Sequence, residues 1–436
     1  MVTKFKAKIN QKKARIAVIG LGYVGLPLAI EFAKKGFKAL GVDLDRNKVN
    51  SITAGNSYIL DIPSEEIKPL LRKGTLRATR DYSRLKEVDA IIICVPTPLR
   101  KTKDPDMSFI VSAAESIAKN LKEGQVIVLE STTYPGTTEE VILPILEATG
   151  LKVGKDFCLG FSPERIDPGN PTYMTHNIPK VVSGMTKICR DNIELLYAQI
   201  VGKVIPVSSV KVAEMVKLLE NTFRSVNIGL VNELALMCDS LKVDVWEIIE
   251  AAKTKPFGYM PFYPGPGLGG HCIPIDPIYL AWKARIQGFE PRFIDLASKV
   301  NADMPEHVVE RVSRSLNNRF GKAVKGAKVL VLGLSYKKDV TDTRESPAYE
   351  VIEELRERGA AISYHDPFVP ESRLCGRKMR SVKLTASELK SKDCVVIVTD
   401  HSDVDYGFIV KNSKFILDTR NALRNIKTNR NKIERL

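Results

Sequence analysis

The feature that most constrains the fold is a glycine-rich turn near the N-terminus, between an apolar run and a run with helical spacing. Residues 15–19 form the apolar run, and the sequence Gly20-Leu-Gly22-Tyr-Val-Gly25 follows immediately. Residues 27–35 have helical spacing, and a second apolar run, 38–42, ends at Asp43. A strand, a glycine turn, a helix and a second strand make a βαβ unit, which predicts a parallel sheet. Further strands are expected at 90–95, 125–130, 157–161 and 180–183. The chain is therefore expected to have an α/β fold.

The same pattern predicts a dinucleotide site. Glycines in this context allow a tight turn and a close approach of the pyrophosphate, and the helix N-terminus favours phosphate. Asp43 ends the second strand at the position where an acid binds the ribose hydroxyls. A carboxylate there repels a 2′-phosphate, so we expect NAD rather than NADP. The alternative is a glycine turn that only packs the helix against the strand. That alternative would leave Asp43 without a role.

A second glycine-rich segment surrounds a single cysteine. Residues 262–277 contain Gly265, Gly267, Gly269 and Gly270, several prolines, Cys272, and a carboxylate four residues later. Glycine lets backbone approach a ligand closely, and proline stiffens the segment. A thiol beside a carboxylate on such a loop predicts covalent catalysis. The alternative is a structural cysteine beside a turn, which is the commoner role of the residue.

The pattern becomes helical from about residue 210 to about residue 253. Lys217, Asn221 and Asn232 fall near one face of this helix, among mainly apolar neighbours. We expect a buried polar row in which Lys217 assists proton transfer or stabilises an oxyanion. The alternative is a solvent-facing polar stripe. The length and apolar character of the helix suit a dimer interface.

A second, smaller α/β unit follows. Residues 328–332 are again an apolar run ending in a glycine turn, here with one glycine, and Ser346 and Pro347 are placed as N-cap and first turn of a helix. Lys337, Lys338 and Arg344 precede that helix and predict a site for a different anion. A charged surface loop is the alternative.

Composition narrows the functional classes. The 436 residues suggest two or three domains, and the net charge of +15 fits anionic ligands such as dinucleotides and sugar nucleotides. No basic run is interleaved with aromatic residues as nucleic-acid binding would favour, and the densest basic stretch, 420–435, is predicted to be a solvated tail. Residues 16–30 are uncharged, but their glycines favour strand, turn and helix over a signal peptide.

The seven cysteines are odd in number and contain no Cys-x-x-Cys pair. This usage predicts neither a disulfide framework nor a zinc site, and it suits a reducing, cytoplasmic location. We expect no metal, no nucleic-acid partner and no membrane association.

Taken together, these segments resemble the UDP-glucose/GDP-mannose dehydrogenase family over essentially the whole chain after a short N-terminal extension. The matching residues are Gly20-Leu-Gly-Tyr-Val-Gly25-Leu-Pro27, Ser131-Thr132, Pro163-Glu164, Lys217-x-x-x-Asn221, the loop to Cys272 and Asp276, and Lys337-Lys-Asp-x-x-Asp-x-Arg344. The resemblance implies two Rossmann-like doubly wound domains joined by a central long-helix segment. The boundaries expected are 1–205 for NAD, 206–318 for the central segment and 319–436 for the nucleotide sugar.

The resemblance also implies a four-electron oxidation of a sugar C6 alcohol to the carboxylate with two NAD⁺. Cys272 would form a thiohemiacetal and then a thioester, with Asp276 and Lys217 as candidate bases through a bound water. Lys217 and Asn221 would stabilise the oxyanion, and Glu164 with Thr132 would position the hydrolytic water. The implied cofactor-binding residues are Gly20, Gly22, Tyr23, Val24, Gly25, Asp43, Lys48, Thr97, Thr132 and Arg344. The implied substrate-binding residues are Glu164, Arg165, Lys217, Asn221, Phe262, Tyr263, Gly269, Gly270, His271 and Lys337.

The identity of the sugar is suggested by two residues near the cysteine. His271 precedes Cys272, and Ile275 stands where family members acting on UDP-glucose often carry Lys. The loop is more similar to that of members acting on UDP-N-acetylglucosamine, with UDP-N-acetylmannosamine and UDP-glucose as alternatives. A two-electron dehydrogenase would not need the cysteine, and a non-enzymatic sensor would release no NADH. The expected assembly is a homodimer or a larger homo-oligomer.

Overall fold

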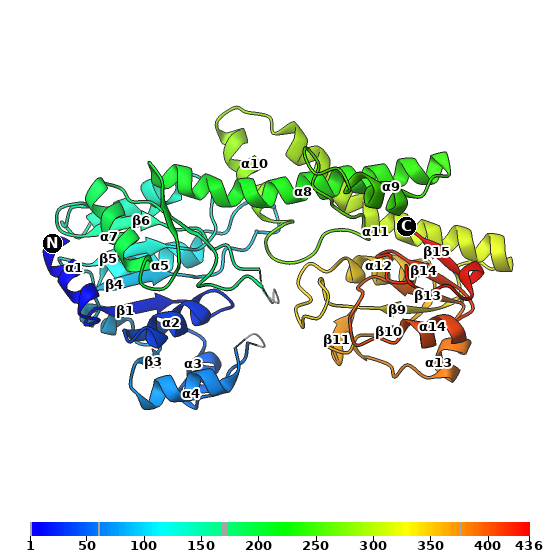
Figure 1. The fold of residues 1–436 in the computed structure, drawn as a ribbon, viewed down its shortest axis with the longest axis horizontal. Coiled ribbons are helices and arrows are strands. Elements are labelled where there is room, and N and C mark those ends of the chain that lie inside the picture. The colour runs from blue at the N-terminus through cyan, green and yellow to red at the C-terminus, as the bar shows by residue number, and fades with distance from the viewer. Residues whose placement is uncertain (1, 60–61, 168–171, 375) are drawn as a thin grey trace. The chain divides into compact units, whose positions relative to one another are not determined.

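The computed structural model describes residues 2–59, 62–167, 172–374 and 376–436. It divides into two compact units, one containing the chain up to Glu220 together with Ile278–Gly288, the other containing Asn221–Pro277 and Phe289–Leu436. Figure 1 shows the elements of both along the chain. Cys375, one of the seven cysteines counted above, lies outside the described residues.

The first unit is built on a parallel six-stranded sheet with the order β3-β2-β1-β4-β5-β6. This is the doubly wound order of dinucleotide-binding domains. The strands are β1 Arg15–Ile19, β2 Lys38–Val42, β3 Leu76–Thr79, β4 Ala90–Ile93, β5 Val126–Leu129 and β6 Cys158–Phe161. The sequence predicted all of these except β3. The run predicted at 180–183 is a strand, β7 Lys180–Val182, but it pairs with β8 Val204–Pro206 in a separate two-stranded sheet.

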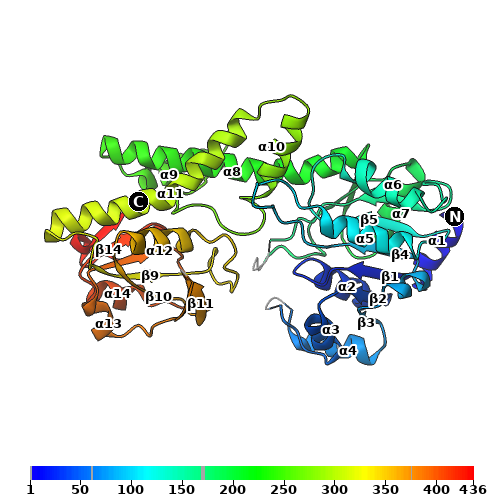
Figure 2. The ribbon, with the colours of Figure 1, turned by 180° about the vertical axis from the view of Figure 1, so that it is seen from behind.

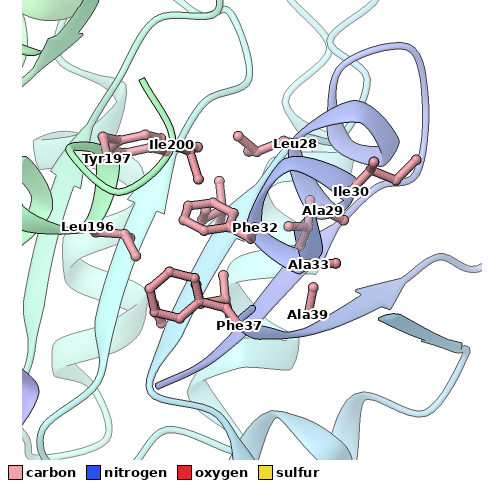
Figure 3. Packing of buried hydrophobic residues seen from close by; sticks show 14 of the residues in the cluster. Leu28, Ala29, Ile30, Phe32, Ala33, Phe37, Ala39, Leu196, Tyr197 and Ile200 are labelled. Carbon is pink, nitrogen blue, oxygen red and sulfur yellow. The ribbon is translucent and has the colours of Figure 1, made fainter. Parts of the chain in front are cut away.

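Both faces of this sheet are covered, because successive residues of each buried strand point to opposite sides. One face packs against α1 Val2–Asn10, α2 Gly25–Lys34, α3 Arg46–Thr53, α4 Ser64–Arg72 and α7 Lys187–Tyr197. The other packs against η1 Tyr82–Glu87, α5 Ser108–Ala118, η2 Thr138–Ile142 and α6 Leu143–Glu147. In Figure 3 the rings of Phe32 and Phe37 lie close together beside Leu196 and Tyr197 of α7.

The second unit contains a parallel sheet with the order β10-β9-β13-β14-β15, labelled in Figure 1 and seen from behind in Figure 2. Its strands are β9 Lys328–Leu332, β10 Ala361–His365, β13 Cys394–Ile397, β14 Ile416–Asp418 and β15 Ile433–Arg435. Helices α11 Arg292–Phe320 and α12 Pro347–Glu357 cover one face, and α13 Ala386–Ser391 and α14 Tyr406–Asn412 cover the other. Strands β11 Glu371–Leu374 and β12 Arg377–Arg380 form a hairpin. Ser346 caps α12 and Pro347 occupies its first turn, as predicted.

The prediction of a solvated tail at 420–435 was wrong. Its last residues form β15, which pairs in parallel with β14, and the terminal Leu436 is buried. The indole Nε1 of Trp246 donates to the carbonyl oxygen of Leu436 at 3.0 Å. The many basic side chains suggested an exposed segment. The strand could not be predicted from neighbouring residues, because it depends on pairing with β14.

The predicted helical stretch begins with α8 Val210–Leu241, whose residues belong to both units. It is interrupted before α9 Val245–Ala252, because Lys242 has a left-handed φ of 61° and Asp244 caps the new helix through its carboxylate. Helix α10 spans Asp276–Ile286, and the short 3-10 helix η3 Arg430–Lys432 precedes β15. None of the helices in the described part of the chain is both long and apolar enough to cross a membrane.

Candidate active site

The three glycines of the first turn have different structural tasks. A Cβ at Gly20 would lie 2.5 Å from the carbonyl oxygen of Cys94, and one at Gly25 would lie 1.8 Å from that of Gly20. Gly20 also has a φ of +91°, which side chains rarely adopt. A Cβ at Gly22, in contrast, would meet nothing within 4 Å. Gly20 and Gly25 therefore allow the backbone to pack, whereas Gly22 leaves open space.

This open space adjoins a helix end suited to a phosphate. Helix α2 follows the turn, and its N-cap residue Val24 provides no side-chain hydrogen bond. The N-terminal N–H groups of a helix without a side-chain cap are available to an anion, and the helix dipole favours negative charge there. Tyr23 is exposed at the same turn. The residues present thus fit a dinucleotide pyrophosphate.

Asp43 is tied to the same turn. One of its carboxylate oxygens accepts from Leu21 N at 2.8 Å, and the other accepts from Asp45 N at 2.9 Å. Lys48 Nζ lies 3.4 Å from Asp43 Oδ2. The acid is therefore held at the end of β2 with one cation beside it, which is the arrangement expected at a ribose.

The polar loops after β4 and β5 have mixed roles. Thr97 is buried, and its carbonyl accepts from the hydroxyl of Tyr279 at 2.9 Å. Ser131 Oγ donates to the carbonyl of Val95 at 2.8 Å, which joins the two loops, and the adjacent Thr132 is partly exposed. Thr132 is therefore the more accessible of the two predicted threonines.

Glu164 follows β6 and is held by several donors. Its Oε1 accepts from the main-chain N–H groups of Arg165 and Ile166, both at 2.7 Å, and its Oε2 lies 3.1 Å from Lys180 Nζ. Burial raises the pKa of Glu164, but attraction to Lys180 and the main-chain hydrogen bond outweigh burial and leave this pKa below its usual range. Glu164 is therefore a fixed anion. Arg165 pairs with Glu220 at 2.6 Å.

The buried polar row predicted on α8 is confirmed. Lys217, Asn221 and Asn232 are all buried, and the row also includes Glu214 and Ser225, which the sequence reading missed. Glu214 accepts from Gly136 N at 2.6 Å and from Thr138 N at 2.9 Å. It thereby fixes the loop that contains Thr132 to α8, one turn before Lys217.

The two asparagines of the row have different partners. Asn221 Nδ2 donates to Asp276 Oδ2, and Asn221 Oδ1 accepts from Arg224. Asn232 donates to Asn301 Oδ1 at 2.8 Å and accepts from Gly265 N at 2.9 Å. Asn232 therefore holds the cysteine loop in place, and Asn221 orients the carboxylate of that loop.

Cys272 is partly exposed at the start of α10. Its carbonyl accepts from Ile275 N at 3.1 Å and from Asp276 N at 2.8 Å, so the chain turns directly from the cysteine into the helix. Helix N-termini favour negative charge, and cysteines at such positions are commonly reactive. Asp276, the first helical residue, is buried. The loop thus combines a thiol, a helix N-terminus and a carboxylate oriented by Asn221.

The glycines of this loop have a purpose that we did not predict from the sequence. We expected them to admit a ligand, but a Cβ at Gly269 or Gly270 would lie 2.7 Å from the side chain of Tyr336. A Cβ at Gly267 would lie 3.0 Å from Pro347, and one at Gly265 would lie 2.6 Å from Arg420. These glycines allow the loop to pack closely against the C-terminal part of its own unit.

The cysteine loop also contacts the segment before α12. Gly270 N donates to the carbonyl of Arg344 at 3.0 Å, and burial together with Arg344 lowers the pKa of His271. The guanidinium of Arg344 pairs with Asp342 at 2.6 Å. Arg344 therefore belongs to the unit of Cys272, whereas the glycine turn that it was predicted to assist belongs to the other. Lys337 lies on the same segment, and its carbonyl accepts from Ser335 Oγ at 3.1 Å.

A cavity of about 640 Å³ lies within the second unit and is lined by residues from the α9 region and from the C-terminal sheet. Tyr263 lines it, stacks on Trp246 with ring centroids 6.1 Å apart, and donates to Glu250 at 2.7 Å. Phe262 does not line it, because its ring packs edge-on against Phe223. Of the two aromatic residues predicted to bind the substrate, Tyr263 therefore lines the cavity, whereas Phe262 packs against an apolar cluster.

Three arginines at this cavity were missed because they lie in the segment interpreted as a tail: Arg420, Arg424 and Arg435. Arg420 is partly buried, and burial lowers the pKa of its guanidinium group. Asn421 lies between the first two, and within the described residues its buried Oδ1 has no hydrogen-bond partner. Guanidinium groups beside stacked aromatic rings are suited to a nucleoside diphosphate.

Comparison with known proteins agrees with this geometry. Three models of one family match successive parts of the chain. The NAD binding domain of the UDP-glucose/GDP-mannose dehydrogenase family matches residues 14–201, its central domain matches 211–303, and its UDP binding domain matches 330–425.

Similar proteins cover nearly the whole chain. A UDP-N-acetyl-D-glucosamine 6-dehydrogenase from Pseudomonas aeruginosa is 39% identical over 82% of this chain and 84% of its own length. Protein CapL of Staphylococcus aureus is 37% identical over 95% and 97%. A solved structure of a UDP-D-ManNAc dehydrogenase from Pyrococcus horikoshii has a TM-score of 0.86 at 35% identity, covering 94% of this chain and 96% of that one.

The fold, the glycine turn with its acid, and the cysteine loop therefore agree with the family models along the chain. The cofactor is NAD, and the C-terminal domain is of the UDP-binding type. The chain belongs to the UDP-glucose/GDP-mannose dehydrogenase family, and it is a nucleotide-sugar dehydrogenase.

Proposed function

We propose that the protein oxidises the C6 hydroxyl of UDP-N-acetylglucosamine to the carboxylate in two steps, through a covalent intermediate on Cys272. The observation that carries this proposal is the position of Cys272 at the start of α10, beside an Asp276 that Asn221 orients. UDP-N-acetylmannosamine and UDP-glucose are the alternative substrates. Relatives named for each of the two N-acetyl sugars support the class of substrate.

The first step requires a base for the C6 hydroxyl proton. Asp276 and Lys217 are the candidates, acting through a water, because one belongs to the cysteine loop and the other lies one turn before Asn221 on α8. Bound NAD⁺ supplies the acceptor for the hydride that leaves C6 in each oxidation. Gly22, the N-terminus of α2 and Asp43 would hold its pyrophosphate and ribose.

The second step depends on the thiol. The Cys272 sulfur bonds to the aldehyde carbon and forms a thiohemiacetal, and loss of a second hydride gives a thioester. Lys217 and Asn221 would stabilise the oxyanion. Water, which Glu164 and Thr132 would position, then adds to the thioester carbonyl, the C–S bond breaks, and the thiolate leaves. The balance is two hydrides removed and one water consumed per carboxylate formed.

The cavity of the second unit supports recognition of the UDP group there. Tyr263 provides a ring face, and Arg420 and Arg424 provide guanidinium groups of the charge and geometry that a diphosphate requires. His271 and Ile275 are the residues proposed to distinguish the C2 substituent, since Ile275 leaves room and His271 offers a polar edge. A missing partner for an acetamido group would cost about 1–3 kcal/mol.

The test is the number of NADH molecules formed per carboxylate. The expected result is two, with UDP-N-acetylglucosamine giving the highest kcat/KM among the four sugars UDP-N-acetylglucosamine, UDP-N-acetylmannosamine, UDP-N-acetylgalactosamine and UDP-glucose. One NADH per turnover would show a two-electron dehydrogenase, and none would show a binding protein. A preference for UDP-glucose would overturn the choice of sugar alone.

The matched variants are Cys272→Ser and Cys238→Ala. Cys238 is a buried cysteine of α8, so its variant controls for the loss of a thiol. We expect Cys272→Ser to lose carboxylate formation and Cys238→Ala to retain it. Carboxylate formed by Cys272→Ser at the normal rate would remove the cysteine from the mechanism.

We also propose that the protein is a homodimer that pairs through α8. Exposed apolar side chains recur along this helix at intervals of three, four or seven residues, as in coiled-coil seams: Val212, Met215, Leu219, Phe223, Leu230, Met237 and Leu241. An exposed stripe of this length is unusual for a monomer. Sedimentation of the double variant Leu219→Glu and Leu230→Glu should give half the mass of the parent. A parent that is already monomeric would contradict the proposal.

A further inference from the structure

The first unit contains a buried group of charges of which the proposed mechanism uses only Glu164. Lys180 Nζ lies 2.9 Å from Glu130 Oε2 and 3.1 Å from Glu164 Oε2, so the ammonium bridges two carboxylates. The exposed fraction of the Lys180 side chain is 6%, and that of Glu130 is 0%. Tyr197 donates its hydroxyl to Glu130 Oε1 from the end of α7. These four side chains are called the Lys180 cluster below.

The cluster is costly to bury, since each ion loses its hydration. A buried ion pair is often no better for stability than apolar residues of similar volume. The carboxylates outnumber the ammonium, and Tyr197 is a neutral donor. The cluster is therefore poorly explained by stability alone, and Glu164, its most exposed carboxylate at 10%, is the member proposed to act on water.

The geometry restricts Glu164 from two sides. One oxygen is fixed by two main-chain N–H groups, and the other is fixed by Lys180. Lys180 is shared with Glu130, so the attraction that Glu164 experiences depends on the charge of Glu130. When Glu130 is neutral, the ammonium stabilises Glu164 alone and makes it a weaker base. When Glu130 is ionised, Glu164 becomes a stronger base.

Burial raises the pKa of Glu130 to about 7, against the opposing effect of Lys180. The charged or titratable groups around it are Lys180 from β7, Tyr197 from α7, Glu164 after β6, and Cys94 after β4. Lys217 of α8 adds a positive charge near Glu164. The raised pKa of Glu130 lies in the neutral range, where a change of pH alters its charge.

We propose that Lys180 is a positioning residue for the hydrolytic step, and that the charge of Glu130 sets the basicity of Glu164 through it. The inference rests on the proposed role of Glu164. In the step concerned, the water oxygen bonds to the thioester carbon and its proton passes to Glu164. The C–S bond then breaks, and its electron pair leaves on the Cys272 sulfur.

The experiment follows formation and decay of the Cys272 adduct separately in the full-length enzyme. Rapid mixing with UDP-N-acetylglucosamine and NAD⁺ gives the rate of NADH formation, and mass spectrometry of acid-quenched samples gives the amount of thioester on Cys272. The variants are Lys180→Met, Lys180→Arg and Glu130→Gln. Glutamine can still accept from Lys180 and donate to Tyr197, so the last variant removes charge and retains shape.

We expect Lys180→Met to slow decay of the adduct by about 100-fold, the scale of a lost acid–base contribution, because without the ammonium Glu164 is neither fixed nor kept ionised beside the buried Glu130. NADH formation in the first turnover should change little. The thioester should then accumulate. Lys180→Arg should restore decay, because it keeps the charge. Glu130→Gln should slow decay at pH 8 and remove the inflection near neutral pH from its pH profile. The control is Lys187→Met, which breaks the exposed Lys187–Asp191 pair of the same unit.

The outcomes separate this inference from the proposed function. A parent enzyme that forms no NADH and no adduct would overturn the proposed function. A normal adduct whose decay is unaffected in Lys180→Met and Glu130→Gln would overturn this inference alone. Equal slowing of formation and decay would also overturn it, because that result indicates a structural role. If Lys180→Met does not fold, the pH profile of Glu130→Gln decides.

Discussion

The two large parallel sheets begin in the same way and diverge at the third residue after β1 and β9. β1 is followed by Gly20, Leu21 and Gly22, and β9 is followed by Gly333, Leu334 and Ser335. Gly333 resembles Gly20, since its φ is +85° and a Cβ there would lie 2.4 Å from Thr399. The tight turn is therefore common to both sheets, and the residue that follows it is not.

The third residue decides whether the turn leaves space for a ligand. Gly22 leaves free space, whereas Ser335 is buried and its Oγ lies 3.1 Å from His401 Nε2. The acids that follow β2 and β10, Asp43 and Asp366, also differ between the two sheets. Asp366 accepts from Leu334 N at 2.6 Å and Ser335 N at 2.9 Å, and it also contacts His401 at 3.1 Å.

Both acids are buried, but the Asp43 side chain is 11% exposed with Lys48 beside it, whereas the Asp366 side chain is 0% exposed. The same arrangement of strand, glycine turn and acid thus provides a dinucleotide site in the first sheet. In the second sheet it provides a set of internal hydrogen bonds around Asp366. A nucleotide sugar must use another part of the second unit, which is consistent with the cavity beside Arg420.

The largest expected effect comes from breaking the hydrogen bonds of Asp366. Asp366→Asn places an amide opposite two main-chain donors and should lower the free energy of unfolding by about 3 kcal/mol. Burial opposes ionisation, but the bond to His401 and the main-chain N–H groups lower the pKa of Asp366 to about 2. Because this pKa is below its ordinary value, the stabilisation is present above about pH 4 and is lost as the pH falls toward 2.

Denaturant unfolding between pH 2 and pH 8 checks this prediction. The parent should lose stability over the acid range, and Asp366→Asn should show a flatter profile. Asp43→Asn is the matched variant, and it should lower the free energy of unfolding by less, about 1 kcal/mol, because its amide would face one main-chain donor rather than two. Equal losses in the two variants would show that both acids are structural.

The second effect closes the open turn. Gly22→Ala should fold normally, because the added Cβ meets nothing, but the methyl group should obstruct the pyrophosphate. An overpacking cost of about 2 kcal/mol corresponds to a roughly 30-fold larger dissociation constant for NAD⁺. Calorimetric titration with NAD⁺, alongside the melting temperature, measures both quantities. Unchanged affinity would place the cofactor away from this turn.

The third effect concerns Asp43, the less buried of the two acids. Asp43→Asn should weaken NAD⁺ binding by about tenfold, because a charged acceptor for the ribose hydroxyls is lost. It should also reduce the preference for NAD⁺ over NADP⁺, since repulsion of the 2′-phosphate disappears. Comparing kcat/KM for the two cofactors gives the answer. A parent enzyme that uses both equally would show that Asp43 does not reach the ribose.

The smallest effect tests whether opening the second turn is sufficient for binding. Ser335→Gly removes the hydroxyl contacts with His401 and with the carbonyl of Lys337, which should cost about 1 kcal/mol. No second equivalent of NAD⁺ should bind, because Asp366 is still occupied by main-chain donors. Binding of two equivalents in the titration would contradict the distinction between the two sheets.

Much of this comparison was predictable from the sequence. The strands β1, β2 and β9, the glycine turns, Asp43 and the Ser346 cap depend on neighbouring residues, because backbone sterics and side-chain periodicity act over a few positions. The buried row of α8 was predictable for the same reason, since Lys217 and Asn221 are one turn apart. The active-site roles carried over from the family resemblance remain proposals.

Other features were decided only by the tertiary structure. Glu130 is 50 residues from Lys180 and 67 from Tyr197 along the chain, and no local pattern joins them. The glycines before Cys272 were assigned to a ligand because the contact with Tyr336 depends on the docking of a segment far along the chain. The strand at 433–435 was assigned to a tail because its partner, β14, supplies the hydrogen bonds that make it a strand. In each case the physical reason is the same: local sterics fix the turn, the cap and the periodicity, whereas a buried charge or an edge strand is defined by partners that only the folded chain brings within hydrogen-bonding distance.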